Sequence, residues 1–96
     1  MRVYNNSNID GLAARAAADL REQGWRVAEV SNYPWGIIPK TTAYYRPGTP
    51  EKAAALSLAS AFGIRAKPRF DGIDDASSGL IVIVTKDYKG PVGKSG

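Results

Sequence analysis

Residues 80–84 are Leu-Ile-Val-Ile-Val, the longest apolar run in this chain of 96 residues. Four of the five are β-branched, which favours a strand, and every position is apolar rather than every second one. A strand of this kind is covered on both faces. We therefore expect it in the middle of a sheet. The run is far shorter than the roughly 20 residues that span a bilayer, so we expect a soluble chain.

Two segments upstream of this run have the apolar period of a helix. In 9–23 the stripe comprises Ile9, Leu12, Ala13, Ala16, Ala17 and Leu20, and in 50–62 it comprises Ala54, Ala55, Leu58, Ala59 and Phe62. Ser7 with Asp10 fits a capping box, and Gly24 and Gly63 stand where helices end. Thr49-Pro50-Glu51 has the residues of a helix start. These patterns predict two helices.

Three further strands are predicted at 2–4, 25–31 and 41–46, while Pro68 allows at most an edge segment near it. The order is β-α-β-β-α-β, which predicts an α+β two-layer sandwich of about four strands with both helices on one face. A ferredoxin-like strand order would place 80–84 at an edge, where five apolar residues are a liability. Either the strand order differs from the ferredoxin-like one, or something packs against the strand at 80–84 at that edge. We expect one domain over 1–90 and a flexible tail over 91–96.

The composition excludes several kinds of chemistry. The chain has no cysteine and no histidine, which rules out thiolate and imidazole metal sites, haem attachment and Cys or Ser/His nucleophiles. Asp71, Asp74 and Asp75 lack the ligand spacing of a calcium loop and fit a solvated turn. We expect no enzyme activity, no metal and no cofactor.

An apolar loop between the second and third predicted strands is the least ordinary segment. Tyr33 and Trp35 lie in it, and Tyr44, Tyr45 and Arg46 belong to the strand that follows. Tyr44 and Tyr45 must point to opposite faces of the sheet because side chains alternate along a strand. Two interpretations stay open. Either Trp35 plugs the open sheet face, or these five residues form a binding surface for sugar rings or a protein partner.

The net charge of +4 favours anionic partners only mildly, because the charges are scattered. Single-stranded nucleic acid is the alternative partner, since similar sheets present aromatic stacking platforms to RNA. The strand at 80–84 lacks the Lys/Arg-Gly-Phe/Tyr run of such domains, so nucleic acid is disfavoured. Asn5-Asn6-Ser7 ahead of a helix could cradle an anion, but it has neither a glycine-rich loop nor an adjoining lysine.

Nearly the whole chain resembles the LytR C-terminal domain family. The matching motifs are Val3-Tyr4-Asn5-Asn6-Ser7, Gly11-Leu12-Ala13, Gly24-Trp25, Thr41-Thr42, Tyr44-Tyr45, the helix at 54–62, the run at 80–84 and Asp87-Tyr88. Asn6 replaces a family glycine, as an asparagine that tolerates left-handed backbone can. Thr85 also stands where glycine is usual, so we expect the backbone geometry of the final turn to differ from that of the family.

The resemblance implies a bacterial, extracytoplasmic module of the cell envelope. It implies a non-catalytic role in binding wall polymer, either peptidoglycan or attached glycan, or an envelope protein partner. It also implies a membrane-anchored parent protein, whose upstream transmembrane helix is absent from these 96 residues.

Overall fold

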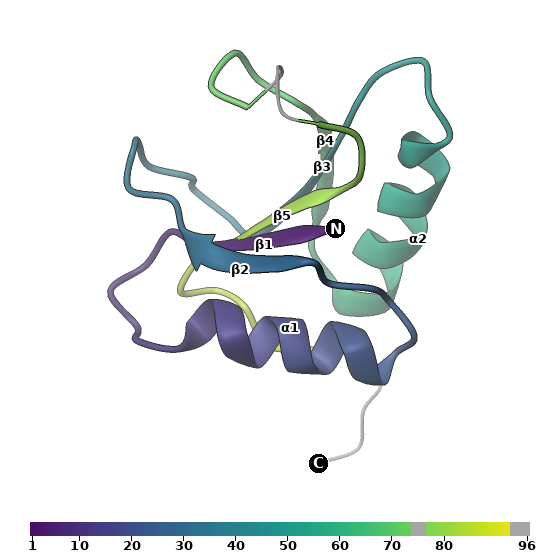
Figure 1. Ribbon diagram of the computed structural model, residues 1–96. Helices are drawn as coiled ribbons and strands as arrows, with labels where there is room; N and C mark the ends of the chain where they lie inside the picture. Colours follow the sequence, from purple (N-terminus) through teal and green to yellow (C-terminus); the bar gives the residue numbers. More distant parts are fainter. Residues whose placement is uncertain (74–76, 93–96) are drawn as a thin grey trace.

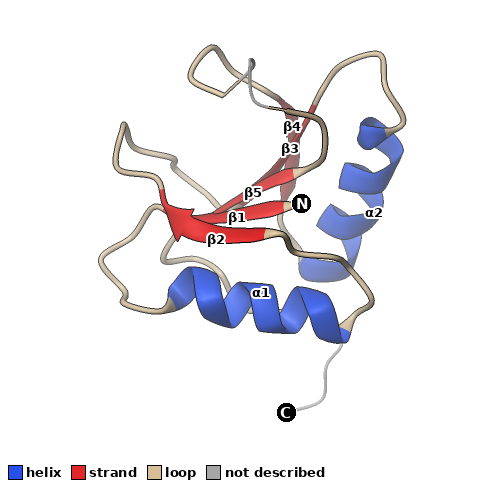
Figure 2. Cartoon of the chain, in the orientation of Figure 1, coloured by secondary structure: helices blue, strands red, loops and turns tan. Residues whose placement is uncertain are grey.

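The computed structural model describes residues 1–73 and 77–92, and in them two helices pack on one face of a mixed five-stranded sheet (Figures 1 and 2). The elements in chain order are β1 (Arg2–Asn5), α1 (Leu12–Glu22), β2 (Glu29–Asn32), β3 (Thr42–Tyr45), α2 (Glu51–Phe62), β4 (Arg65–Pro68) and β5 (Ile81–Val84). This arrangement confirms the predicted α+β sandwich, with one strand more than expected.

The strand order is β2-β1-β5-β3-β4, so β5 lies in the centre. β5 runs parallel to β1 and antiparallel to β3. All four of its residues are buried, because one face meets the helices and the other is covered by loops. The central position predicted from the apolar run is confirmed, and the ferredoxin-like order does not occur. The additional strand β4 ends at Pro68 and occupies an edge, where a missing backbone N–H does not interrupt the sheet.

Helix α1 begins three residues later than predicted. Gly11 precedes it with a left-handed backbone (φ 76°), and Ser7 does not cap it. Instead the Ser7 hydroxyl accepts a hydrogen bond from Ile9 N at 3.1 Å within the preceding turn. The predicted capping box is therefore wrong, because the Ser7 hydroxyl is hydrogen-bonded within the turn that precedes the helix. At the other end Gly24 is left-handed (φ 92°), and Trp25 N donates to Leu20 O at 3.0 Å.

Helix α2 follows its sequence signals closely. The Thr49 hydroxyl accepts a hydrogen bond from Glu51 N at 3.2 Å, and Gly63 ends the helix with φ 62°. Ala55, Leu58 and Phe62 are its buried residues.

The inner core lies between the sheet and both helices. It includes Val3 and Val82 from the sheet, Ala16 and Leu20 from α1, and Leu58 from α2. The small residues of α1 bring that helix close beneath β1 and β2 (Figure 2).

A second, smaller core covers the other face of the sheet. Its buried members come from β3, from β5 and from the two loops that follow β2 and β4. They are Tyr33, Tyr44, Ile73, Ile81 and Ile83. These loops fold over the outer face of β5, above the strands in Figure 1. The sheet is therefore covered on both sides near its centre, although helices cover only one side.

Two predictions concern residues outside the described ranges. Asp74 and Asp75 of the acidic cluster lie outside them, whereas Asp71 is described and exposed. Residues 93–96 of the predicted tail also lie outside them. Val92 is described, and its N–H donates a hydrogen bond to Ala61 O at 2.8 Å.

Candidate functional site

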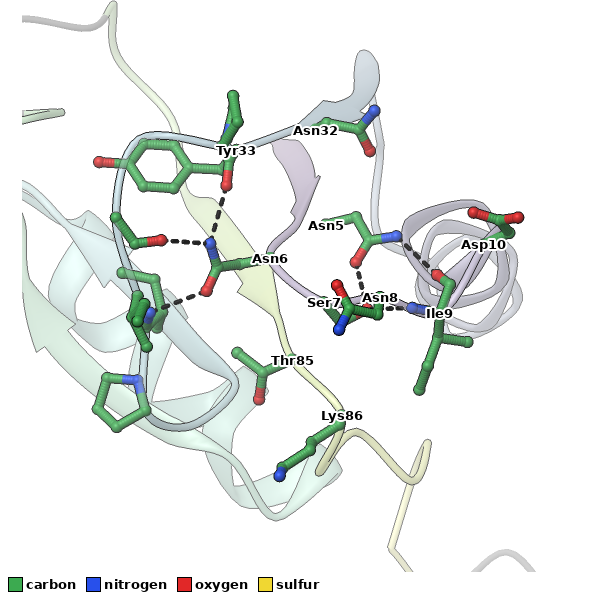
Figure 3. A pocket seen from close by; sticks show the side chains of 15 residues that line it. Asn5, Asn6, Ser7, Asn8, Ile9, Asp10, Asn32, Tyr33, Thr85 and Lys86 are labelled. Carbon is green, nitrogen blue, oxygen red and sulfur yellow. Dashed lines mark hydrogen bonds between the residues drawn. The ribbon is translucent and has the colours of Figure 1, made fainter.

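The loop at 33–38 is held in place by a single side chain from the turn after β1. Asn6 Nδ2 donates to Tyr33 O and to Gly36 O, both at 2.8 Å, and Asn6 Oδ1 accepts from Ile38 N at 2.8 Å (Figure 3). Asn6 N also donates to Val84 O at 2.8 Å. Three backbone groups of the loop are thus hydrogen-bonded to the turn that follows β1, next to the carboxyl end of β5.

Tyr33, and not Trp35, plugs the outer face of the sheet. Tyr33 is 7% exposed and Trp35 is 76% exposed. The Tyr33 ring stacks on Tyr4 at 6.5 Å between centroids and meets the edge of Phe70 at 6.1 Å. Trp35 makes an edge contact with the Tyr33 ring, with 5.5 Å between centroids. Trp35 therefore presents most of its indole to solvent.

The five candidate binding residues do not form one surface. Tyr44 is buried on the outer face against Phe70, with 5.1 Å between ring centroids, and burial raises its pKa. Tyr45 faces the opposite way and packs against the inner core. The predicted alternation of the two tyrosines is thus confirmed, and only Tyr44 shares a face with Tyr33.

Arg46 lies at the other end of the sheet and has an internal partner. Its Nε donates to Glu51 Oε2 at 2.7 Å, and its backbone N donates to Glu51 Oε1 at 2.9 Å. Burial would raise the pKa of Glu51, but hydrogen bonds from Gly79 and Arg46 outweigh it and hold that pKa below its ordinary value. Arg46 follows β3 where β5 begins, whereas Trp35 follows β2 where β5 ends. This separation removes Arg46 from the surface around Trp35.

The 33–38 loop separates two hollows, and each has at least one exposed apolar side chain of the loop in its wall. The smaller, of about 410 Å³, lies over the outer face of β1 and β2 beside Trp35. The larger, of about 960 Å³, lies beyond the carboxyl ends of β1, β2 and β5 beside Ile37, which is 91% exposed.

The larger hollow has two walls and a floor, which Figure 3 shows from close by. One wall is the turn at 5–10, where Asn5 Nδ2 donates to Ile9 O at 2.9 Å and the Ser7 hydroxyl donates to Asn5 Oδ1 at 2.6 Å. The other wall is the 33–38 loop together with Pro39, and the floor is Thr85 with Lys86. Polar side chains from three distant parts of the sequence therefore meet at one place.

The floor is fixed by a threonine and aspartate network beneath it. Asp87 Oδ1 accepts hydrogen bonds from the hydroxyls of Thr41 and Thr85, both at 2.6 Å, and from Thr41 N at 3.0 Å. Thr85 N in turn donates to the Thr41 hydroxyl at 3.0 Å. Burial would raise the pKa of Asp87, but these hydrogen bonds outweigh it and hold that pKa below its ordinary value. Thr85 therefore takes part in the turn through both its backbone N–H and its hydroxyl.

Sequence reasoning missed how Asn6 acts. We expected a left-handed backbone at Asn6, but among the described residues only glycines have positive φ. Its side chain, which a glycine lacks, holds the loop instead. The available signal was the polar run Asn5-Asn6-Ser7-Asn8 beside an apolar loop, but the sequence does not reveal that the two meet.

The order β2-β1-β5-β3-β4 with both helices on one face defines a compact two-layer α+β domain. Within that class, the chain belongs to the LytR C-terminal domain family. It matches the family described as "LytR cell envelope-related transcriptional attenuator" over residues 1–88, which confirms the resemblance seen in the sequence.

Two relatives and one solved structure support this membership. The chain is 35% identical over 85 residues to the "Vesiculogenesis and immune response regulator" of Mycobacterium tuberculosis, covering 88% of this chain and 52% of that protein. It is 30% identical over 95 residues to the "Cell wall biosynthesis protein LcpA" of Corynebacterium glutamicum, covering 99% of this chain and 18% of that protein. The solution structure of the C-terminal domain of RV0431 superposes with a TM-score of 0.60 at 36% identity, covering 88% of this chain and 69% of that one.

The chain spans about half the length of the first of these relatives and about a fifth of the second. Among the described residues, no helix is both long and apolar enough to cross a membrane.

Proposed function

We propose that this chain is a non-catalytic, extracytoplasmic module of the bacterial cell envelope that binds wall polymer, either peptidoglycan or its attached glycan. In this proposal a membrane-anchored parent protein carries the module. Family membership and the name of the cell wall biosynthesis relative support the setting. An envelope protein is the alternative partner.

The observation that carries the binding role is the solvent exposure of a rigidly held apolar loop. Trp35 and Ile37 point outward, although three hydrogen bonds to Asn6 fix the loop's backbone. A fixed indole offers a large contact area at low entropic cost. Exposed apolar groups on a fixed loop are typical of recognition surfaces rather than of packing.

The structure gives a physical argument against the nucleic-acid alternative. An RNA-recognition sheet leaves its outer face open for bases to stack on aromatic rings. Here Tyr33 and Tyr44 are buried on that face beneath the loops. Trp35 is the only aromatic side chain of the described residues that is largely exposed, and one ring is a poor platform for successive bases.

Co-sedimentation with purified cell-wall sacculi tests the proposal. We expect the wild-type domain to sediment with sacculi, and Trp35→Ala and Ile37→Ser to lose most of that binding while keeping their melting temperatures. Leu56→Ser is the matched control, because Leu56 is an equally apolar residue, 52% exposed, on α2. A wild-type domain that stays in the supernatant would exclude wall polymer and leave the protein partner.

A further inference from the structure

We propose that the larger hollow binds a short stretch of an uncharged glycan whose sugars carry acetamido groups. This inference rests on the proposed function, because it names the part of a wall polymer that one site on this chain would recognise. It concerns the hollow behind Ile37 and not the indole of Trp35, which borders the other hollow.

The position and size of the hollow suit a ligand. It lies beyond the carboxyl ends of three neighbouring strands, which is where open sheets with parallel strands commonly hold ligands. Its volume of about 960 Å³ lies at the upper end of the range for ligand sites.

Four polar side chains that line the hollow are uncommitted. The side chains of Asn8, Asp10, Asn32 and Lys86 take part in no hydrogen bond or ion pair within the described part of the chain. In contrast, the neighbouring side chains of Asn5, Asn6 and Ser7 are used to build the walls. The hollow thus combines a fixed frame with side chains that remain available to a ligand.

The charge of the hollow favours an uncharged ligand. Asp10 and Lys86 contribute opposite charges, so the lining is neutral in sum. Two backbone N–H groups of this turn are already occupied, since Asn6 N donates to Val84 O and Ile9 N donates to the Ser7 hydroxyl. A phosphate-rich polymer would require unpaired donors and surplus cations, as helix-terminal anion sites provide.

The remaining chemistry matches an amino sugar. Asn8 and Asn32 each carry an amide with donors and an acceptor, which complements the N–H and C=O of an acetamido group. Asp10 and Lys86 can accept from and donate to sugar hydroxyls. Ile37, Pro34 and Pro39 add an apolar wall for the C–H face of a pyranose ring.

A pair of matched oligosaccharides tests this assignment in solution. Chitotetraose and cellotetraose share the same β-1,4 backbone, and only the former carries acetamido groups. We expect amide NMR shifts on titration with chitotetraose at residues 5–10, 32–39 and 85–86, with at least severalfold weaker binding of cellotetraose. We expect Asn8→Ala and Asn32→Ala each to weaken chitotetraose binding by about tenfold, the worth of one or two ligand hydrogen bonds.

Gln23→Ala is the matched control for the asparagine variants, because it removes an exposed amide from the end of α1. That variant should bind chitotetraose like wild type. All three changes remove exposed side chains, so unchanged melting temperatures will show that lost binding is not lost folding.

Three outcomes would overturn the inference. The first is that chitotetraose does not bind at concentrations up to about 10 mM, which is weaker than a specific site would bind. The second is that cellotetraose binds equally well. The third is that a polyphosphate chain binds more tightly at the same residues. The sacculus experiment separates this failure from that of the proposed function. If Asn8→Ala and Asn32→Ala sediment with sacculi like wild type, the domain still binds wall polymer, but not through this hollow.

Discussion

Asn6 Oδ1 accepts a hydrogen bond from Ile38 N at 2.8 Å, and this contact joins the turn after β1 to the loop after β2. The same side chain donates to Tyr33 O and Gly36 O. One amide therefore makes three hydrogen bonds to one loop, using both of its N–H donors and one of its two acceptor positions. Both hollows border that loop, so their shapes depend on Asn6.

Replacing Asn6 with alanine should loosen the loop without unfolding the domain. The change leaves Ile38 N, Tyr33 O and Gly36 O without their partner, which we expect to cost about 1 to 3 kcal/mol of unfolding free energy. Denaturant melts measure that cost, and hydrogen exchange of the Ile38 amide measures the local loosening. An Ile38 amide that stays as protected as in wild type would contradict the role of Asn6.

Tyr33 and Trp35 should respond in opposite ways to truncation. Tyr33→Ala removes a buried ring from the outer core and should cost about 3 kcal/mol or more. Trp35→Ala removes an exposed ring and should change stability by less than about 0.5 kcal/mol. Urea melts of both variants under the same conditions compare the two values. A large loss for Trp35→Ala would show that the indole supports the fold.

Gly72 provides an independent test of how tightly the loops cover the outer face. A Cβ at this position would lie 2.9 Å from Phe70 Cε2 and 3.0 Å from the Tyr33 hydroxyl. Gly72→Ala should therefore displace one of these rings and cost about 1 to 3 kcal/mol. Chemical-shift changes should centre on Tyr33 and Phe70, and a variant as stable as wild type would indicate that the loops can yield.

The main elements of this fold could be predicted because their signals are local. The run at 80–84 is apolar at each position and became the central strand, and Gly24 and Gly63 end the two helices. Strand order depends on pairing between residues far apart in the chain, which no local pattern records. Strand order therefore stayed open, and the region of β4 was predicted only as a segment that could at most form an edge, which is where β4 lies.

The candidate site was harder to predict for the same reason. Tyr33 and Trp35 are two residues apart and equally aromatic, and only the loop's path decides which ring enters the core. Asn6 fixes that path from 27 residues away. Arg46 likewise appeared available in the sequence, but Glu51 engages it. Composition identified the unusual loop, whereas long-range contacts determine which of its side chains remain exposed.

Leu58 and Leu56 form a matched pair for testing the inner core. Leu58 is fully buried on α2 and Leu56 is 52% exposed on the same helix. Leu58→Ala should cost about 2 to 5 kcal/mol because it leaves a cavity between the helix and the sheet. Leu56→Ala should cost less than about 0.5 kcal/mol. Similar losses for the two variants would mean that α2 is rotated about its axis relative to the sheet.

Asp87 should make the domain less stable in acid. Its pKa in the folded domain lies below the ordinary 3.8, because hydrogen bonds from Thr41 and Thr85 outweigh the effect of burial. A carboxyl group with a depressed folded pKa stabilises the fold above its unfolded pKa, and this contribution is lost as the pH falls through the folded value. Asp87→Asn should be less stable than wild type at pH 7 by about 1 to 2 kcal/mol, since hydrogen bonds to a charged acceptor are replaced by weaker ones.

The difference between wild type and Asp87→Asn should therefore shrink as the pH is lowered from 3.8 through the lower pKa of the folded domain, because wild-type Asp87 then also becomes neutral. Using the difference cancels the parallel effect of Glu51, whose pKa is also lowered and which both proteins retain. Asp71→Asn is the control, because its carboxylate is exposed and makes no hydrogen bond within the described residues. Urea melts across this pH range measure the effect, and a constant difference would show that the threonines do not stabilise the charged form. Because this network fixes Thr85, which lines the larger hollow, acid should also weaken ligand binding there before the domain unfolds.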